Sequence, residues 1–195
     1  MTLLVCFLTG RSDRSNTALS LDQRAFLDAL PVGAHERLDA NFPYAPASGP
    51  WRRTPLPVAS VRNARDYLAA RHPRFALDHA NAVRRVLTAA DRTLVLAGSC
   101  GLELLAGLQL DGTAARGVHV LAYGPVARAR PPGISLETVV GRHDPLARRW
   151  ARRADHVIDA GHLDYLASPE FRSIAARAVE RLRSSAPSHA AGSGA

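Results

Sequence analysis

The sequence contains no lysine, only two cysteines and no long apolar run. Two cysteines, Cys6 and Cys100, cannot form a disulfide framework, and we expect both to be reduced thiols of a cytoplasmic protein. Because no apolar segment approaches the length of a membrane-spanning helix, the sequence predicts no membrane span. Residues 2–9 are apolar, but no basic region precedes them and no cleavage-type segment follows. This pattern indicates a buried strand instead of a signal peptide.

Without lysine, the positive charge comes entirely from arginine. The 25 basic residues outnumber the 17 acidic ones, which gives a formal net charge of +8. In a chain so rich in alanine, we attribute this excess to biased composition, with arginines dispersed over helix faces. A basic nucleic-acid-binding protein is the alternative, but the sequence has neither a reading motif nor basic residues interleaved with aromatic ones. We therefore expect no nucleic-acid partner.

The length and apolar content are those of one globular domain. A chain of 195 residues with 47% hydrophobic residues can bury a sizeable single core, and nothing in the sequence suggests a second one. We expect a domain over residues 1–184. Residues 185–195, rich in serine, alanine and glycine, should form a disordered tail.

Short apolar runs with strand character alternate with helical patterns. Strands are expected at residues 3–8, 38–42, 93–97, 118–123, 136–141 and 155–159. Helices are expected at residues 20–30, 60–71, 75–89, 102–110 and 169–183. The first helix should begin with a capping box of Ser20 and Gln23, whereas five prolines in residues 43–57 exclude a helix or central strand there. The alternation predicts an α/β fold, with a mostly parallel sheet of about six strands flanked by helices on both faces.

One segment, residues 94–102, combines a strand, a tight turn and the start of a helix. It reads L-V-L-A-G-S-C-G-L, with Ser99 at the apex of the turn between the small residues Ala97 and Gly101. This is the pattern of a nucleophile elbow, in which bulky side chains two positions from the serine would collide with the neighbouring strand and helix. The helix would point the N–H of Cys100 at whatever Ser99 attacks. A plain strand-to-helix turn, capped by the serine, is the alternative.

A serine nucleophile needs a base, and the base needs an acid that orients it. Asp144 follows the predicted strand 136–141, and His162 follows the predicted strand 155–159. Ser99, Asp144 and His162 thus all come just after strands, and the carboxyl ends of parallel strands share one edge of the sheet. We therefore expect the three side chains to converge, in a chain order typical of α/β hydrolases.

The chain resembles the α/β-hydrolase superfamily over about residues 3–184, as a small member with no cap domain. A-G-S-C-G resembles the family's elbow, G-R-H-D its acid loop and A-G-H-L-D-Y-L its histidine loop. The resemblance implies that Ser99 is the nucleophile, that Asp144 is the orienting acid, and that His162 acts as general base and then as acid. The chain departs from the family where Ala97 replaces the commoner glycine, and it lacks the usual two N-terminal antiparallel strands.

The resemblance also implies an oxyanion hole. Its donors would be the backbone N–H of Cys100 and one N–H from the loop after the first strand, at Gly10 or Arg11. Arginines in this loop and around the acid loop would give the site a basic rim, suited to an anionic substrate or carrier. These arginines are Arg11, Arg14, Arg142, Arg148, Arg149, Arg152 and Arg153.

The irregular segment 43–57 is the only long loop available to wall a site that has no cap. It follows the predicted strand 38–42, so it should lie at the catalytic edge of the sheet. Its Tyr44 and Trp51 can present flat apolar surface to an acyl group, and we expect both to bind substrate. The alternative is that the two aromatic side chains pack the loop onto the body of the protein.

Other nucleophile and base candidates are weaker. Cys100 could replace Ser99, but a motif centred on the cysteine would put Leu102 where a small residue is needed. His119 lies within a predicted strand, which favours a satisfied core or edge histidine. His143 follows a strand beside the predicted acid, and we expect it at the rim of the site.

The acid has competitors as well. Asp159 and Asp164 flank His162, and either could orient it, but the family arrangement implies Asp144. No pair of histidine, cysteine or aspartate residues has the spacing of a structural zinc site, so no metal is predicted.

These observations favour a serine hydrolase that cleaves an ester or thioester through an acyl-enzyme and needs no cofactor. A thioesterase for carrier-bound or coenzyme-A-bound acyl groups is one form of it, since an acidic acyl carrier protein would suit a basic rim. A non-catalytic binding or scaffold protein with a hydrolase fold is the alternative. The same fold also carries amide and C–C bond cleavage, and the sequence specifies neither the acyl group, the leaving group nor the oligomeric state.

Overall fold

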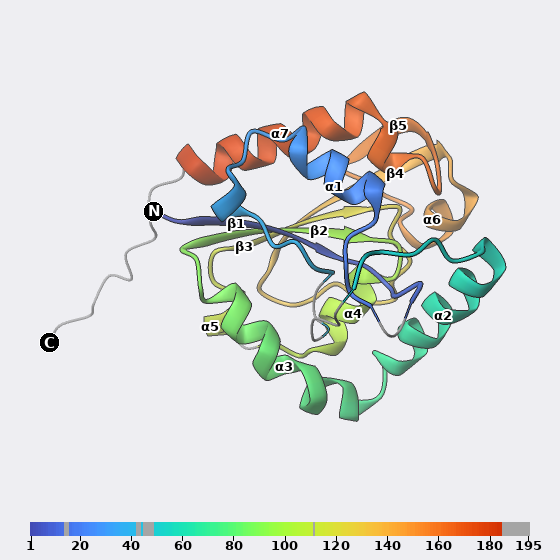
Figure 1. The fold of residues 1–195 in the computed structure, drawn as a ribbon, viewed down its shortest axis with the longest axis horizontal. Coiled ribbons are helices and arrows are strands. Elements are labelled where there is room, and N and C mark those ends of the chain that lie inside the picture. The colour runs from blue at the N-terminus through green and yellow to red at the C-terminus, as the bar shows by residue number, and fades with distance from the viewer. Residues whose placement is uncertain (14–15, 42–43, 45–48, 111, 185–195) are drawn as a thin grey trace, which may run out of the picture.

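The computed structural model describes residues 1–13, 16–41, 44, 49–110 and 112–184. Five strands form a single sheet (Figure 1). They are β1 (Leu3–Leu8), β2 (Arg92–Gly98), β3 (Val118–Tyr123), β4 (Ser135–His143) and β5 (His156–Gly161). The strands lie in the order β1-β2-β3-β4-β5, and every neighbouring pair is parallel. The predicted α/β fold with a parallel sheet is therefore confirmed.

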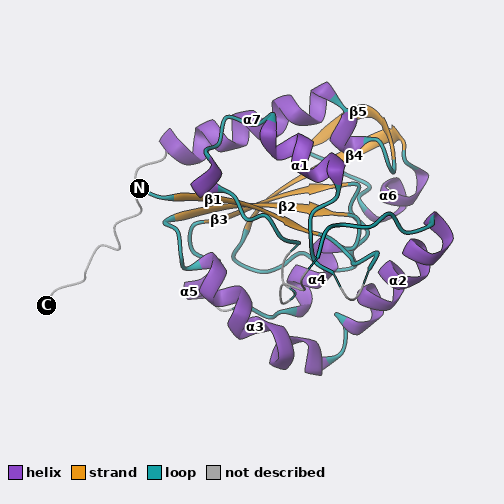
Figure 2. Cartoon of the chain, viewed as in Figure 1, coloured by secondary structure: helices purple, strands orange, loops and turns teal. Residues whose placement is uncertain are grey.

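Helices cover both faces of this sheet, as Figure 2 shows. The helices of the described residues are α1 (Leu21–Asp28), α2 (Leu56–Ala69), α3 (Pro73–Leu87), α4 (Gly101–Gly107), α5 (Gly112–Ala115), α6 (Pro145–Trp150) and α7 (Pro169–Ser184), with the 3-10 turns η1 (Ala34–Glu36) and η2 (Tyr165–Ala167). α1 and α7 pack on one face, and α2, α3, α4 and α5 lie on the other. α6 directly follows the carboxyl end of β4, so it lies at the edge of the sheet where the predicted site residues gather.

Each face of the sheet has its own apolar core, because successive side chains of a strand point to opposite faces. Phe7 of β1 joins the α1–α7 side, where the rings of Phe26 and Phe171 stack with their centroids 5.0 Å apart. Leu8, the next residue, joins the opposite core together with Leu104 of α4. Burying each such side chain stabilises the fold by about 1.5 to 3 kcal/mol, so β1 and β2 are held firmly from both sides.

The sheet has five strands where about six were predicted, because residues 38–41 of the predicted strand 38–42 do not join it, and Phe42 lies outside the described residues. Arg37 forms an isolated bridge with Val5 of β1, where the Leu38 N–H donates to the Val5 carbonyl at 3.0 Å, and Ala40 forms another with Ala18. Further along, the side chain of Asn41 replaces a backbone ladder: its Oδ1 accepts from the Thr9 N–H at 2.9 Å, and its Nδ2 donates to the Thr9 carbonyl. An asparagine that satisfies neighbouring backbone in this way competes with regular pairing.

Local signals placed most helix ends correctly. The capping box at the start of α1 is confirmed, with the Gln23 N–H donating to Ser20 Oγ at 3.2 Å and the Ser20 N–H to Gln23 Oε1 at 2.9 Å. The helix expected at 60–71 instead begins at Leu56 and ends at Ala69, so the exclusion of helix up to residue 57 was wrong. Pro57 stands in the first turn, where a proline sacrifices no intrahelical hydrogen bond.

Two further findings concern the described residues only. No helix among them is long and apolar enough to cross a membrane. Within the same part of the chain, no three histidine, cysteine, aspartate or glutamate side chains gather as metal ligands would. The predicted tail, residues 185–195, lies outside the described residues, as do Arg14, Pro43 and residues 45–48 of the predicted wall.

Candidate active site

Ser99 occupies the turn between β2 and α4 in a backbone conformation that is unusual for serine. Its φ is +51°, in the left-handed region that costs an L-residue free energy unless the surroundings enforce it. The carbonyl of Ser99 accepts a hydrogen bond from the Val126 N–H at 2.9 Å, which ties the turn to the loop after β3. Such an enforced φ is what a nucleophile elbow requires.

Close packing against β1 explains the small residues of the turn. A Cβ on Gly101 would come within 1.9 Å of the Leu8 carbonyl oxygen, a distance that no folded backbone tolerates. Ala97 is fully buried, with Leu8 and Ala122 as its neighbours across the sheet. The helix that follows the serine therefore sits directly on the neighbouring strand, and only small residues allow this approach.

The structure brings the three predicted triad residues together at the carboxyl edge of the sheet. Ser99 Oγ lies 3.2 Å from His162 Nε2, and His162 Nδ1 lies 2.8 Å from Asp144 Oδ2. The three residues follow β2, β5 and β4, and the imidazole is 27% exposed. Both ring nitrogens of the histidine are thus engaged, one by a hydroxyl and the other by a carboxylate, while solvent or a ligand still reaches the site.

Asp144 is fully buried and its carboxylate is fully hydrogen-bonded. It caps α6, with Oδ1 accepting from the Ala147 N–H at 2.9 Å, and its Oδ2 accepts from the hydroxyl of Tyr165 at 2.8 Å. Burial alone would raise the pKa of Asp144, but the hydrogen bonds from Ala147, His162 and Tyr165 outweigh it and hold the pKa below its ordinary value. The group is therefore a carboxylate at neutral pH, as an orienting acid must be.

The rival acids have other partners. Asp159 Oδ1 lies 2.8 Å from His143 Nε2, and both side chains are about three-quarters exposed. Asp164 Oδ2 accepts from the Gly161 N–H at 3.1 Å. Neither carboxylate takes the place that Asp144 holds beside His162.

The rival nucleophile and base are also placed elsewhere. Cys100 is buried, and burial raises the pKa of its thiol to about 12, so almost no thiolate exists at neutral pH. His119 is buried in β3, with Nδ1 at 2.9 Å from Ser135 Oγ and Nε2 at 3.2 Å from Glu137. It is a histidine of the sheet, away from the elbow, although its buried Nε2 forms no hydrogen bond within the described residues.

The backbone N–H groups of Gly10 and Cys100 are two of the predicted oxyanion donors, and that role stays a prediction. Both act on the Cys100 thiol, where they oppose the effect of burial on its pKa, so both lie beside the same sulfur. A Cβ on Gly10 would come within 2.7 Å of that sulfur and of Asn63 Oδ1, so only glycine lets the loop approach the elbow this closely. The other predicted donor, the N–H of Arg11, is already occupied because it donates to Asp66 Oδ2 at 2.8 Å.

Sequence reasoning missed the part played by α2 beside this loop. Asp66 is 1% exposed and also accepts from the Arg11 guanidinium, with Nη2 at 2.9 Å from Oδ1. One turn earlier, Arg62 Nη1 donates to the Ser12 carbonyl at 2.7 Å. Asn63 Oδ1 is buried without a hydrogen-bond partner in the described part of the chain. The sequence does show these polar residues at helical spacing, but such a pattern normally indicates a solvent-exposed face.

The two predicted substrate-binding aromatics differ in their surroundings. Tyr44 is 6% exposed, with the Arg11 guanidinium 3.7 Å above its ring and the His79 ring in edge contact at 5.6 Å. These contacts are those of a side chain that packs its segment onto the body of the protein. Trp51 is half-buried, and its part in substrate binding stays a prediction.

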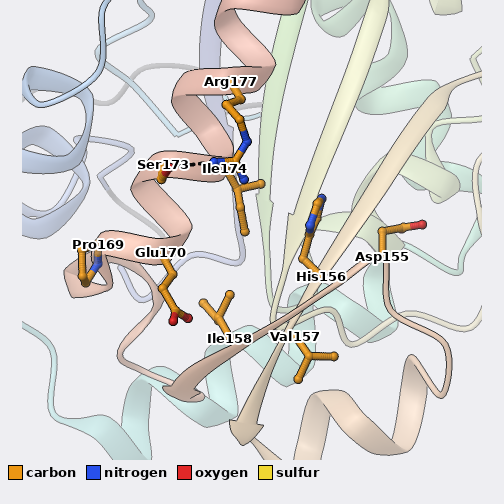
Figure 3. A pocket seen from close by; sticks show the side chains of 9 residues that line it. All are labelled: Asp155, His156, Val157, Ile158, Pro169, Glu170, Ser173, Ile174 and Arg177. Atoms are coloured by element: carbon orange, nitrogen blue, oxygen red, sulfur yellow. Dashed lines mark hydrogen bonds between the residues drawn. The ribbon is translucent and has the colours of Figure 1, made fainter.

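The arginines of the predicted rim that surround the acid loop are exposed, whereas Arg11 is mostly buried against Asp66. Arg142, Arg148 and Arg152 line a groove of about 400 Å³ between β4, β5 and the segment around α6. A second groove of about 640 Å³ lies between β5 and α7, with His156, Glu170 and Arg177 among its lining side chains (Figure 3). Neither groove is lined by Ser99, Asp144 or His162, so neither is a pocket of the triad itself.

Comparison with known proteins adds little to this geometry. No family model and no curated protein matches the chain. Among solved structures, it is similar to a protein from Xanthomonas campestris pv. campestris described as a candidate hydrolase of the α/β superfamily. The two share 18% identity with a TM-score of 0.47, over 95% of this chain and 100% of that chain. By its own topology, a parallel sheet with a serine elbow after β2, the chain has an α/β-hydrolase-like fold.

Proposed function

We propose that this chain is a serine hydrolase that cleaves an ester or thioester through an acyl-enzyme. One observation carries the proposal: Ser99, His162 and Asp144 form a continuous hydrogen-bonded series, at 3.2 and 2.8 Å, in the three positions that acyl transfer requires. Few arrangements that serve structure alone combine a strained serine, a histidine engaged at both nitrogens and a buried carboxylate.

The first half of the reaction acylates the serine. Ser99 Oγ bonds to the substrate carbonyl carbon while its proton passes to His162 Nε2, and Asp144 stabilises the imidazolium. The carbonyl oxygen becomes an oxyanion, which the N–H groups of Gly10 and Cys100 stabilise by hydrogen bonds. As the tetrahedral intermediate collapses, the C–O or C–S bond breaks, and His162 gives its proton to the leaving oxygen or sulfur.

The second half releases the acid. A water molecule gives a proton to His162 and attacks the acyl carbon, forming a second tetrahedral intermediate at the same two N–H groups. Its collapse breaks the bond to Ser99 Oγ, which recovers the proton from the histidine. The product is a carboxylic acid, and the enzyme returns to its starting state.

The substrate class is an acyl ester or thioester, with a carrier-linked or coenzyme-A-linked thioester as the form that the charge favours. The exposed arginines near α6 and the net charge of +8 attract an anionic carrier or leaving group. An acidic acyl carrier protein fits this charge. Trp51 is the aromatic side chain of the predicted wall that keeps exposed surface for an acyl chain.

The test is labelling by a fluorophosphonate, which reacts with an activated serine, combined with hydrolysis of a panel of esters and thioesters. The Ser99→Ala variant should lose labelling and hydrolysis while its melting curve stays close to that of the unmodified protein. The matched control, Cys100→Ala, should keep both, because the neighbouring side chain supplies no nucleophile. Loss of labelling in Cys100→Ala alone would move the nucleophile to the cysteine. No labelling of the unmodified protein would favour a non-catalytic binding protein with this fold.

A further inference from the structure

The hydroxyl of Tyr165 contacts the acid of the triad, although Tyr165 is not one of the three triad residues. It donates to Asp144 Oδ2 at 2.8 Å, the same oxygen that lies 2.8 Å from His162 Nδ1. On its other side it accepts a hydrogen bond from the Gly141 N–H at 2.7 Å. The hydroxyl is therefore the third group, after Ala147 and the histidine, that fixes the carboxylate of Asp144.

The Tyr165 ring is rigidly held. It is 2% exposed, and it packs against Tyr123 and Phe171 with centroids 5.7 and 6.2 Å away. A Cβ on Gly124 would come within 2.8 Å of the ring, and one on Gly141 would come within 3.2 Å of the hydroxyl. The surroundings thus leave one place for the ring, and with it one place for the hydroxyl.

The direction of the hydrogen bonds follows from the partners. The Gly141 N–H can only donate, so the hydroxyl accepts from it and its single proton is left for Asp144. Burial first, and then the neighbouring Asp144 carboxylate, raise the pKa of Tyr165, so the phenol stays protonated across the working range of an enzyme. Tyr165 is therefore a permanent donor to the carboxylate.

We propose that Tyr165 is a positioning residue, whose hydroxyl holds the Asp144 carboxylate in the orientation that keeps His162 aimed at Ser99. This inference rests on the proposed function in assigning the triad its roles. By sharing Oδ2 with the imidazole, the hydroxyl also withdraws charge from the oxygen that stabilises the imidazolium. It therefore weakens the hydrogen bond between Asp144 Oδ2 and His162 Nδ1 while fixing its direction.

Removing the hydroxyl should then have two measurable consequences. The carboxylate gains freedom to rotate, so the fraction of molecules with a productive Ser99–His162 contact falls and kcat falls with it. Because Oδ2 keeps more of its negative charge, its hydrogen bond with His162 Nδ1 strengthens, and the pH profile of kcat/KM changes with it. A tyrosine that merely filled space would change neither quantity.

Other titratable groups surround this part of the site and contribute to any pH profile. The exposed pair of His143 and Asp159 joins the last residue of β4 to the interior of β5, and Asp164 accepts from the Gly161 N–H next to His162. Arg142 and Arg148 lie on the acid loop and α6. All of them are retained in the variants below, so a difference between variants reports on the hydroxyl.

The experiment compares Tyr165→Phe with Tyr123→Phe, which removes a hydroxyl from the same aromatic cluster but from a ring that is not bonded to Asp144. Tyr165→Phe should lower kcat by about tenfold to a hundredfold with little change in KM, the effect of losing one hydrogen bond to a charged group. The acidic limb of its kcat/KM profile should move up by about half a pH unit or more. Tyr123→Phe should change neither value, and melting curves of both variants show whether stability accounts for any loss.

The NMR signal of the His162 Nδ1–H, assigned with a His162→Gln variant, makes the result independent of turnover. A changed signal in Tyr165→Phe, but not in Tyr123→Phe, supports the positioning role. The same signal in all forms overturns it, as does a fall in kcat that matches a fall in stability. If the signal changes as expected but the unmodified protein neither hydrolyses esters nor reacts with fluorophosphonate, the contact stands and the proposed function fails.

Discussion

The two sides of Ser99 are built in different ways. On the acid–base side, Asp144 and Tyr165 are buried next to the apolar core between the sheet and α7, and every oxygen of the carboxylate is hydrogen-bonded. On the oxyanion side, the loop of residues 9–12 is held by polar contacts with α2, above all by the ion pair of Arg11 and Asp66. Asn63 Oδ1 stays unpartnered there, within the described residues.

The two sides differ in whether all their buried polar groups have hydrogen-bond partners. The acid–base side satisfies its own hydrogen bonds and is therefore preorganised before any substrate arrives. On the oxyanion side, the N–H groups of Gly10 and Cys100 face the Cys100 thiol, a weak acceptor, and the buried Asn63 Oδ1 has no hydrogen-bond partner among the described residues. We infer that the acid–base side determines the chemistry and that selectivity arises at the oxyanion side.

The helix beside the oxyanion loop is also less firmly anchored. The inward face of α2 carries polar side chains such as Arg62 and Asp66, while Val61 and Leu68 are more than half exposed. A helix that buries little apolar surface depends on its polar contacts for its position. The position of the oxyanion loop should therefore change when one charge is lost, whereas the acid–base side is held by an apolar core.

The largest expected effect lies on the acid–base side. Asp144→Asn should lower kcat by about four orders of magnitude, because the amide favours the wrong tautomer of His162. Asp159→Asn and Asp164→Asn serve as matched controls and should each cost less than about tenfold, since neither carboxylate contacts the imidazole. Steady-state kinetics on the best ester of the panel measures all three. A loss in Asp159→Asn or Asp164→Asn as large as that in Asp144→Asn would reassign the acid.

An intermediate effect is expected from the ion pair on the oxyanion side. Asp66→Asn leaves the buried Arg11 without its counter-charge, which should cost about 3 to 5 kcal/mol of unfolding free energy. As the loop loses its anchor, kcat/KM should fall by about a hundredfold, the effect of misplacing an oxyanion donor. Urea unfolding and kinetics on folded protein separate the two quantities.

The control for that substitution is Asp78→Asn. Asp78 forms an exposed i,i+4 pair with Arg74 at 3.7 Å on α3, so its loss should change stability by less than about 1 kcal/mol. If Asp66→Asn destabilised the protein without changing kcat/KM of the folded fraction, α2 would be a structural support with no role in the oxyanion hole.

The smallest effect concerns selectivity, and the two tryptophans of the chain test it. Trp51 belongs to the predicted wall, residues 43–57, whereas Trp150 ends α6, where its ring lies 6.2 Å from that of Tyr67 on α2. Trp51→Ala should change the ratio of kcat/KM between short and long acyl chains by about tenfold or more, with a nearly unchanged melting temperature. Trp150→Ala should change that ratio by less than about threefold. A uniform loss across the series in Trp51→Ala would show that this side chain is an anchor.

Local sequence patterns determined the order of elements and the positions of the three triad residues. The alternating apolar runs gave a parallel α/β sheet, and the small residues around Ser99 gave the elbow, because both signals depend on neighbours a few positions away. Even the convergence of Ser99, Asp144 and His162 follows from one rule of parallel sheets, that the carboxyl ends of the strands share an edge.

Only the tertiary structure decided which polar groups around that edge are already occupied. The N–H of Arg11 is taken by Asp66, a residue 55 positions later in the chain, and the carboxylate of Asp144 is shared with Tyr165 across 21 positions. Residues 38–41 fail as a strand because Asn41 pairs with the loop at Thr9. A hydrogen bond between distant residues depends on packing that brings them within 3 Å, and no periodicity in the sequence encodes that distance.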